Sequence, residues 1–197
     1  FASGLLQMEK ATVDLFKRFD DAASGLNKTT GATGKFNDML YDAQEQSKLY
    51  NVTVEDAATS IKELHTQLST FTEMDKESQE QLVETTARFE AYGVSIATTA
   101  GNFDVMIRGM GMSADAANNA QTELLALSDT ISVGMDQIAS DFKSSAGELA
   151  KYGPDAVKVF TGVAAAAKAT GLEVSKLMGL AKQFDTFEGA ATHAGKL

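Results

Sequence analysis

The first 26 residues carry the most regular hydrophobic pattern of the chain. The positions that step by three and four residues, all but one of them apolar, are Leu5, Met8, Thr12, Leu15, Phe19, Ala22 and Leu26. This is the a/d rhythm of a coiled coil. The apolar side chains beside that seam are Leu6, Val13, Phe16 and Ala23. A stripe of this width is also found on ordinary bundle helices. The pattern therefore predicts an amphipathic or coiled-coil helix over residues 1–26, whose partner is either the rest of the chain or further copies of it.

The next stretch, "SGLNKTTGATGK" at residues 24–35, interrupts the pattern with glycine, serine and threonine. Such composition is typical of a connector, so we predict a flexible Gly/Thr linker over residues 27–35. Residues 36–197 then form a multi-helix region. Phe1 is not an initiator methionine, and the last residues still follow a helical pattern. We therefore expect this region to continue in a longer protein.

Several helix starts are marked by an apolar residue followed by a hydroxyl residue. These pairs are Val52-Thr53, Val94-Ser95, Met112-Ser113 and Ile131-Ser132. The hydroxyl can accept a hydrogen bond from an unpaired N–H of the first helical turn. We predict helices that begin after each of these residues, another after Asp75, and a first-turn position for Pro154.

The fold class follows from these patterns and from residue usage. Alanine and threonine are abundant, runs of β-branched and aromatic residues are scarce, and glycines separate the helical stripes. We predict an all-α protein: a coiled-coil-like N-terminal helix followed by a string of short helices that form a helical bundle or an extended helical assembly.

Charge and composition exclude several classes of function. The 197 residues include 17 Lys and Arg against 27 Asp and Glu, a net charge of −10, which disfavours binding to a phosphate backbone. The absence of cysteine excludes disulfides, thiolate metal sites and a cysteine nucleophile. The most apolar stretch, residues 157–172, contains Lys158 and Lys168 and is too short to span a bilayer. Buried packing is the favoured interpretation of it.

No motif points to catalysis or to a cofactor. Residues 109–114, "GMGMSA", match a dinucleotide fingerprint, but that motif works only between a strand and a helix. A glycine hinge between two helices is favoured. His65 and His193 lack the spacing of a zinc site and are interpreted as surface or boundary residues. We therefore expect no catalytic, metal-binding or cofactor-binding residues and no enzyme activity.

Residues 169–197, "ATGLEVSKLMGLAKQFDTFEGAATHAGKL", resemble segments of the tail tape measure proteins of tailed bacteriophages. The specific part is the phrase at residues 184–197. The segments "YGVSIATTAGNF" and "GMGMSADAANNAQTEL" are similar in style to the glycine-punctuated helices of that family.

The resemblance implies a structural role. It also implies that the carboxylates near His193, those of Asp185 and Glu188, lie on the polar face of an interrupted helix. Tape measure proteins are long helical chains that fill the lumen of the tail tube, and their length sets the number of tube rings. They leave ahead of the genome and assist its delivery. The expected partners are other copies of the chain, as a trimer or hexamer, then tail tube, baseplate or tail-tip proteins, and the host envelope on infection. The expected location is the virion, with the host cytoplasm during assembly.

Self-association is expected through the first helix, at Leu5, Met8, Leu15, Phe19 and Leu26. Two other classes of function stay open. One is a helical interaction module, such as a secreted effector or a signalling bundle, although the glycines of residues 93–171 disfavour long uninterrupted heptads. The other is an enzyme carried in a phage tail.

Overall fold

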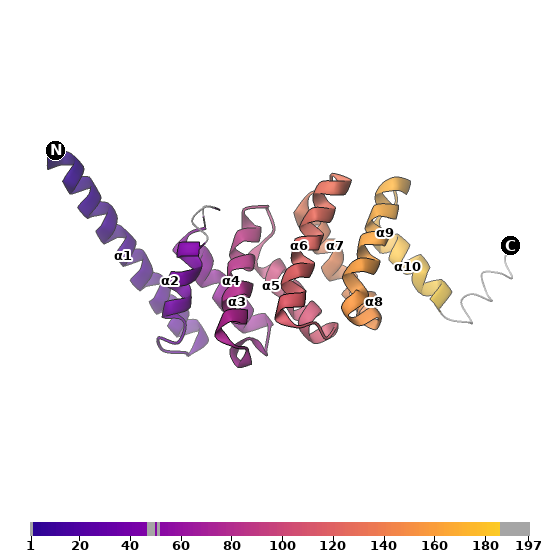
Figure 1. Cartoon of the computed structure of the whole chain (residues 1–197), viewed down its shortest axis with the longest axis horizontal. Helices are drawn as coiled ribbons and strands as arrows, with labels where there is room; N and C mark the ends of the chain where they lie inside the picture. Colours follow the sequence, from indigo (N-terminus) through magenta and orange to yellow (C-terminus); the bar gives the residue numbers. More distant parts are fainter. Residues whose placement is uncertain (1, 47–49, 51, 186–197) are drawn as a thin grey trace. The chain divides into compact units, whose positions relative to one another are not determined.

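A computed structural model describes residues 2–46, 50 and 52–185 of the chain. Every regular element in these residues is helical and none is a strand, which confirms the all-α prediction (Figure 1). The chain divides into two compact units, Phe1–Ala100 and Gly101–Leu197. The predicted division at residue 35 differs from this one, because the first helix packs onto the helices that follow it.

Unit 1 is built around one central helix. The unit contains α1 (Ala2–Thr30), α2 (Asn37–Gln46), α3 (Val54–Gln67), the 3-10 turn η2 (Phe71–Glu73) and α4 (Lys76–Glu90). Helix α3 packs against α1, α2 and α4, and α2 also packs against α4. The largest fully buried side chains are Phe36, Leu40, Ile61, Leu64, Leu68, Phe71 and Leu82. Helix α3 and the residues that follow it to Phe71 thus form the centre of this core.

The first helix is longer than predicted. It continues to Thr30, through residues assigned to the linker, and ends where Gly31 adopts a φ of 68°. Thr30 Oγ1 donates to the carbonyl of Leu26 at 2.8 Å, and Thr29 Oγ1 donates to that of Gly25 at 2.5 Å. These threonines pair with carbonyls of the preceding turn, and Leu26 is buried, so the last turn of α1 is held in place.

The predicted N-terminal caps are confirmed at four of five sites. The side chains of Thr53, Asp75 and Ser113 accept hydrogen bonds from the first turns of α3, α4 and α6 (Ala114–Ile131). Ser95 Oγ accepts from the N–H of Thr98 at 3.1 Å at the start of α5 (Ile96–Asp104). At Thr53 the cap is reciprocal, because the Thr53 N–H also donates to Asp56 Oδ2 at 2.8 Å.

Removing the Thr53 hydroxyl tests the cap of α3. We expect Thr53→Ala to lower the free energy of unfolding by about 1 kcal/mol, since an N–H of the first turn loses its partner. The matched control is Thr66→Ala on the same helix, where the exposed hydroxyl bonds only to the carbonyl of Lys62. That control is expected to be neutral or slightly stabilising. Urea unfolding followed by circular dichroism gives both values, and equal losses would contradict the cap assignment.

Unit 2 is a second helical cluster. With α6 it contains the π-helix η3 (Val105–Gly109), α7 (Met135–Ser144), α8 (Ala146–Leu149), the 3-10 segment η4 (Ala150–Asp155), α9 (Ala156–Thr170) and α10 (Val174–Asp185). Helix α9 packs against α6, α8 and α10, and α6 also packs against α7. Phe142 and Phe160 meet edge to face in the core, with ring centroids 5.3 Å apart.

The predicted helix start at Ser132 is wrong. Ser132 ends α6 with a φ of 51°, and α7 begins at Met135 after Gly134. The side chain of Ser128 donates to the carbonyl of Val133 at 2.7 Å, which closes the end of α6. Pro154 directly follows the kink at Gly153, whose φ is 53°, and lies in the first turn of the helical segment that continues into α9, as predicted.

Residues 109–114 form a hinge between two helices. Gly109 ends η3, Gly111 adopts a φ of 72°, and Ser113 caps α6. Because residues 103–114 contain no strand, the dinucleotide interpretation has no structural support and the glycine hinge is confirmed.

Helix α9 covers most of the apolar stretch at residues 157–172. It buries the face formed by Ala156, Val157, Phe160, Ala164 and Ala167. Among the helices of the described residues, none combines the length and hydrophobicity that crossing a bilayer requires.

Candidate functional site

The first half of α1 presents an apolar surface to solvent. All side chains of residues 9–18 are exposed, whereas the helix becomes half-buried or buried towards its C-terminal end. Val13 is 65% exposed, Leu15 42% and Phe16 72%. Large apolar side chains scattered singly on a surface are common, but here three lie within four residues. We call Val13, Leu15 and Phe16 the α1 apolar surface.

The structure divides the predicted self-association residues between two environments. Leu26 is 3% exposed and belongs to the core of unit 1. Phe19 is half-buried, and its ring centroid lies 5.7 Å from that of Tyr41 on α2. Leu15 remains exposed. Leu5 and Met8 lie on α1, but their side chains are outside the described part of the chain.

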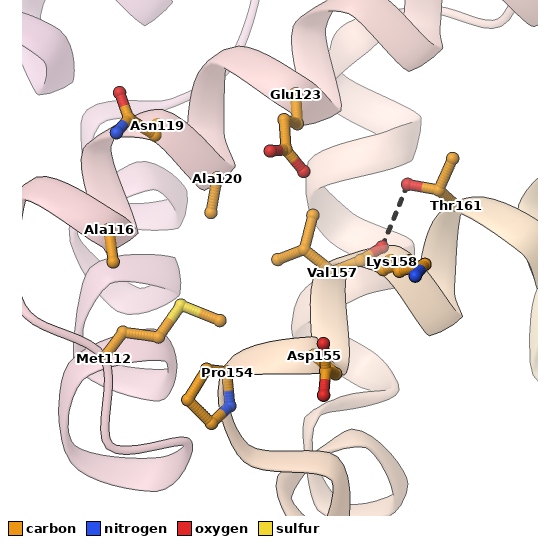
Figure 2. Close-up of a pocket in the computed structure, with 10 residues that line it drawn as sticks. All are labelled: Met112, Ala116, Asn119, Ala120, Glu123, Pro154, Asp155, Val157, Lys158 and Thr161. Carbon is orange, nitrogen blue, oxygen red and sulfur yellow. Dashed lines mark hydrogen bonds between the residues drawn. The ribbon is translucent and has the colours of Figure 1, made fainter.

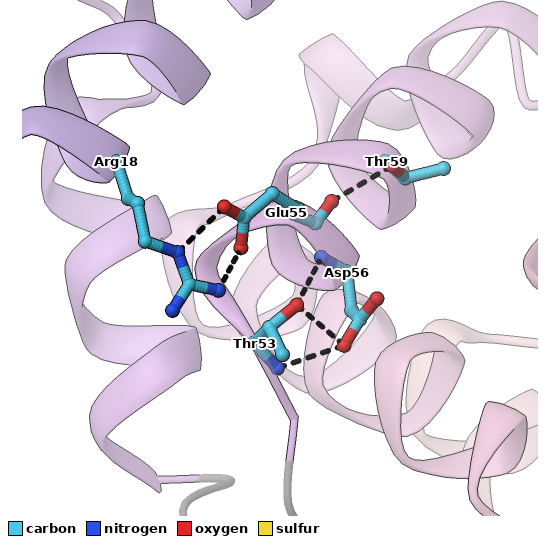
Figure 3. Close-up of polar contacts among 5 residues, drawn as sticks. All are labelled: Arg18, Thr53, Glu55, Asp56 and Thr59. Atoms are coloured by element: carbon cyan, nitrogen blue, oxygen red, sulfur yellow. Dashed lines mark hydrogen bonds and ion pairs between the residues drawn. The ribbon is translucent and has the colours of Figure 1, made fainter. Parts of the chain in front are cut away.

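The boundary between the two environments lies at Arg18. Its Nε donates to Glu55 Oε1 at 2.8 Å and its Nη2 to Glu55 Oε2 at 2.5 Å (Figure 3). Glu55 lies in the first turn of α3, where the helix dipole favours a negative charge. This two-point ion pair fixes α1 on α3 at the end of its packed half. Sequence spacing gives no sign of it, because the partners are 37 residues apart.

The ion pair changes the acidity of its carboxylate. The hydrogen bond from Arg18 lowers the pKa of Glu55 from 4.5 to about 2, despite the opposing effect of partial burial. Glu55 in turn raises the pKa of Arg18. The side chains are 50% and 51% exposed, so salt screens the pair and its contribution to stability is modest.

Acid titration tests this pair. A lowered carboxylate pKa stabilises the fold above the ordinary value of 4.5, and the stabilisation is lost as the pH falls through about 2. We expect the NMR titration of the Glu55 carboxyl carbon to have its midpoint near pH 2, and Arg18→Gln to return it towards 4.5. A Glu55 midpoint that is ordinary in the unchanged protein would contradict the contact. Lys17→Gln, on the next residue, serves as the control and is expected to leave the midpoint in place.

One pocket in unit 2 is lined by three ionisable side chains. It has a volume of about 500 Å³ and lies between α6 and the start of α9 (Figure 2). Its wall is formed by Met112, Ala116, Ala120, Pro154 and Val157, and its polar side chains are Asn119, Glu123, Asp155, Lys158 and Thr161.

The polar side chains of this pocket do not form a nucleophile–base pair. The hydroxyl of Thr161 donates to the backbone carbonyl of Val157 at 2.9 Å, and this is the hydrogen bond that Figure 2 shows among the lining residues. His, Cys, Ser and Tyr are absent from the lining. The pocket therefore gives no argument for a particular reaction.

The described residues contain no group of three or more His, Cys, Asp or Glu side chains that could hold a metal ion. His65 is half-buried and meets the ring of Phe36 edge to face at 6.0 Å, which agrees with the predicted boundary position. His193 and the carboxylate of Glu188 lie outside the described residues, as does the side chain of Asp185.

Comparison with known proteins adds no relative. No protein-family model, no curated protein and no solved structure matches the chain.

Proposed function

We propose that this chain is a structural assembly protein, a segment of a phage tail tape measure protein, that associates with further copies of itself through α1. The proposed self-association rests on one observation, the exposure of the α1 apolar surface. The tape measure part is supported by the sequence of residues 169–197 and by a fold made of helices in the described residues.

The α1 apolar surface needs a partner for physical reasons. A helix gains most of its stability from packing of its apolar face, and residues 9–18 have no such packing within their own unit. The exposed half nevertheless continues the same a/d seam that is packed further along α1. A surface that continues a packed seam is one on which another helix can bind.

A further copy of α1 fits this surface better than an unrelated acidic or basic partner. The exposed half carries Glu9 and Asp14 together with Lys10, Lys17 and Arg18, so both signs of charge alternate along it. Copies of such a helix can align without a large like-charge repulsion, although the whole chain carries −10. We propose a parallel trimer or hexamer, since a wide stripe favours more than two helices.

Catalysis is not part of the proposal. The sequence lacks a cysteine and a nucleophile motif, so we propose a structural role for this segment. Purified chain that digested peptidoglycan, with the activity lost on changing Glu188 or His193, would contradict this.

The tape measure proposal is tested on the complete reading frame and on the virion. We expect the frame to continue past Leu197 for many hundreds of residues in helical pattern. We also expect mass spectrometry to detect peptides of the chain in full virions and to find them depleted after DNA ejection. A stop codon near Leu197, or equal amounts before and after ejection, would contradict the proposal.

A further inference from the structure

We infer that the contact between α1 and α3 is autoinhibitory: it covers the C-terminal half of the seam through which α1 binds further copies of the chain. This inference rests on the proposed self-association. It adds that one face of α1 has two competing partners, α3 within the chain and α1 of another copy.

The competition follows from where the seam residues lie. Leu15, Phe19, Ala22 and Leu26 are spaced by four, three and four residues and therefore share one face of the helix. Leu15 is exposed, Phe19 and Ala22 are half-buried, and Leu26 is buried against its own unit. One helix face cannot pack against α3 and against a neighbouring copy at the same position. While α1 is packed on α3, only the seam before Arg18 is available.

The contact has features that allow it to open. A groove of about 300 Å³, open to solvent, lies between the two helices and is lined by Ala22, Gly25 and Thr29 on α1 and by Ala58 and Thr59 on α3, among others. The two helices do not meet along this groove, which limits the area of their contact. The ion pair that holds the edge is half-exposed, and ion pairs of that kind contribute little in water.

The turn after α1 is bonded to α1 itself. Gly31 and Gly34 adopt φ values of 68° and 73°. The Gly34 N–H donates to Asn27 Oδ1 at 2.9 Å, and the Ala32 N–H donates to Thr30 Oγ1 at 3.3 Å. These hydrogen bonds join α1 to its own turn and not to α3, so release of α1 from α3 does not require breaking them. Release of α1 exposes the complete seam, and copies of α1 can then replace the α3 contact with a longer homotypic one.

Two variants shift the competition in opposite directions without changing the seam. Glu55→Arg, on α3, places two cations together and favours release. Gly25→Cys with Ala58→Cys, joined by a disulfide, holds α1 on α3. An added Cβ at Gly25 meets no atom within 4 Å, and the chain has no other cysteine. The reduced, unlinked protein is the control for the lock. Arg18→Glu with Glu55→Arg restores a pair of opposite charges and is the control for release.

Sedimentation equilibrium of the purified chain measures the outcome. We expect Glu55→Arg to lower the dissociation constant of assembly roughly twofold to fivefold, in line with the loss of a surface ion pair. The charge-swapped pair should return it to the original value, and the lock should raise it at least tenfold until it is reduced. Circular dichroism checks that each variant keeps its helix content.

Different results would overturn self-association and autoinhibition. If the unchanged chain assembles and both variants assemble with the same dissociation constant, autoinhibition is overturned while self-association stands. If the unchanged chain and Glu55→Arg are both monomeric at hundreds of micromolar, both proposals are overturned, because a released α1 has to assemble.

Discussion

Leu15→Asp together with Phe16→Asp is expected to leave the purified chain monomeric at tens of micromolar. Both side chains are exposed in the single chain, so their replacement removes little from its own core. Burying each at an interface contributes roughly 1.5–3 kcal/mol. Losing two per copy raises the dissociation constant by roughly a factor of 100 to 10,000, and the new carboxylates repel one another across the seam.

Phe16 is substituted together with Leu15, in place of Phe19, because of the position of Phe19 in the structure. The pair Leu15 and Phe19, which the heptad spacing alone indicates, would also disturb the contact between Phe19 and Tyr41 inside unit 1. The matched control is Lys10→Gln with Lys17→Gln, which changes the net charge by the same two units on the polar side of α1. Analytical ultracentrifugation compares the variants. The proposed surface is contradicted if the unchanged chain and Glu55→Arg both stay monomeric at hundreds of micromolar, or if the aspartate variant assembles as well as the control.

Phe160→Ala is expected to lower the free energy of unfolding of unit 2 by about 3–5 kcal/mol. Phe160 is fully buried on α9, and its ring meets that of Phe142 on α7. The change removes apolar area, leaves a cavity and breaks the edge-to-face contact. The loss is a large share of the stability of a domain of this size.

Val163→Ala is the control for this prediction. Val163 lies one turn further along α9 and is only half-buried, so we expect a loss below about 1 kcal/mol. Urea unfolding, followed by hydrogen exchange of the α7 and α9 amides, gives the loss in unit 2. Equal effects of the two substitutions would mean that Phe160 does not lie in the core.

Helix positions could be predicted from the sequence where the signal is local. The caps at Thr53, Asp75, Ser95 and Ser113 were found because hydroxyl or carboxylate side chains bond within three residues of themselves. The same signal failed at Ser132, where an apolar residue and a hydroxyl mark the end of a helix. A serine or threonine can lie at either end of a helix. At Ser132 only the backbone conformation, with a φ of 51°, shows that it ends a helix and does not begin one.

The end of α1 and the division of the chain were not predictable in the same way. Both depend on packing between distant segments: Leu26 is buried against its own unit, and the helix continues to Thr30 where glycines and threonines predicted a linker. Only part of the candidate site could be predicted from the sequence. The spacing of apolar residues predicts the a/d seam of α1. Which half of that seam is packed and which is exposed depends on the length of α3 and on the ion pair of Arg18 with Glu55.

We propose that the chain is a segment of a protein that sets tail length. If a tailed phage encodes the chain, the most direct test is electron microscopy of its virions after in-frame deletion or duplication of helical segments in the complete gene. The account predicts tails that shorten with deletion and lengthen with duplication, in proportion to the number of residues changed. Tails of unchanged length, with the altered protein present in the virion, would contradict it.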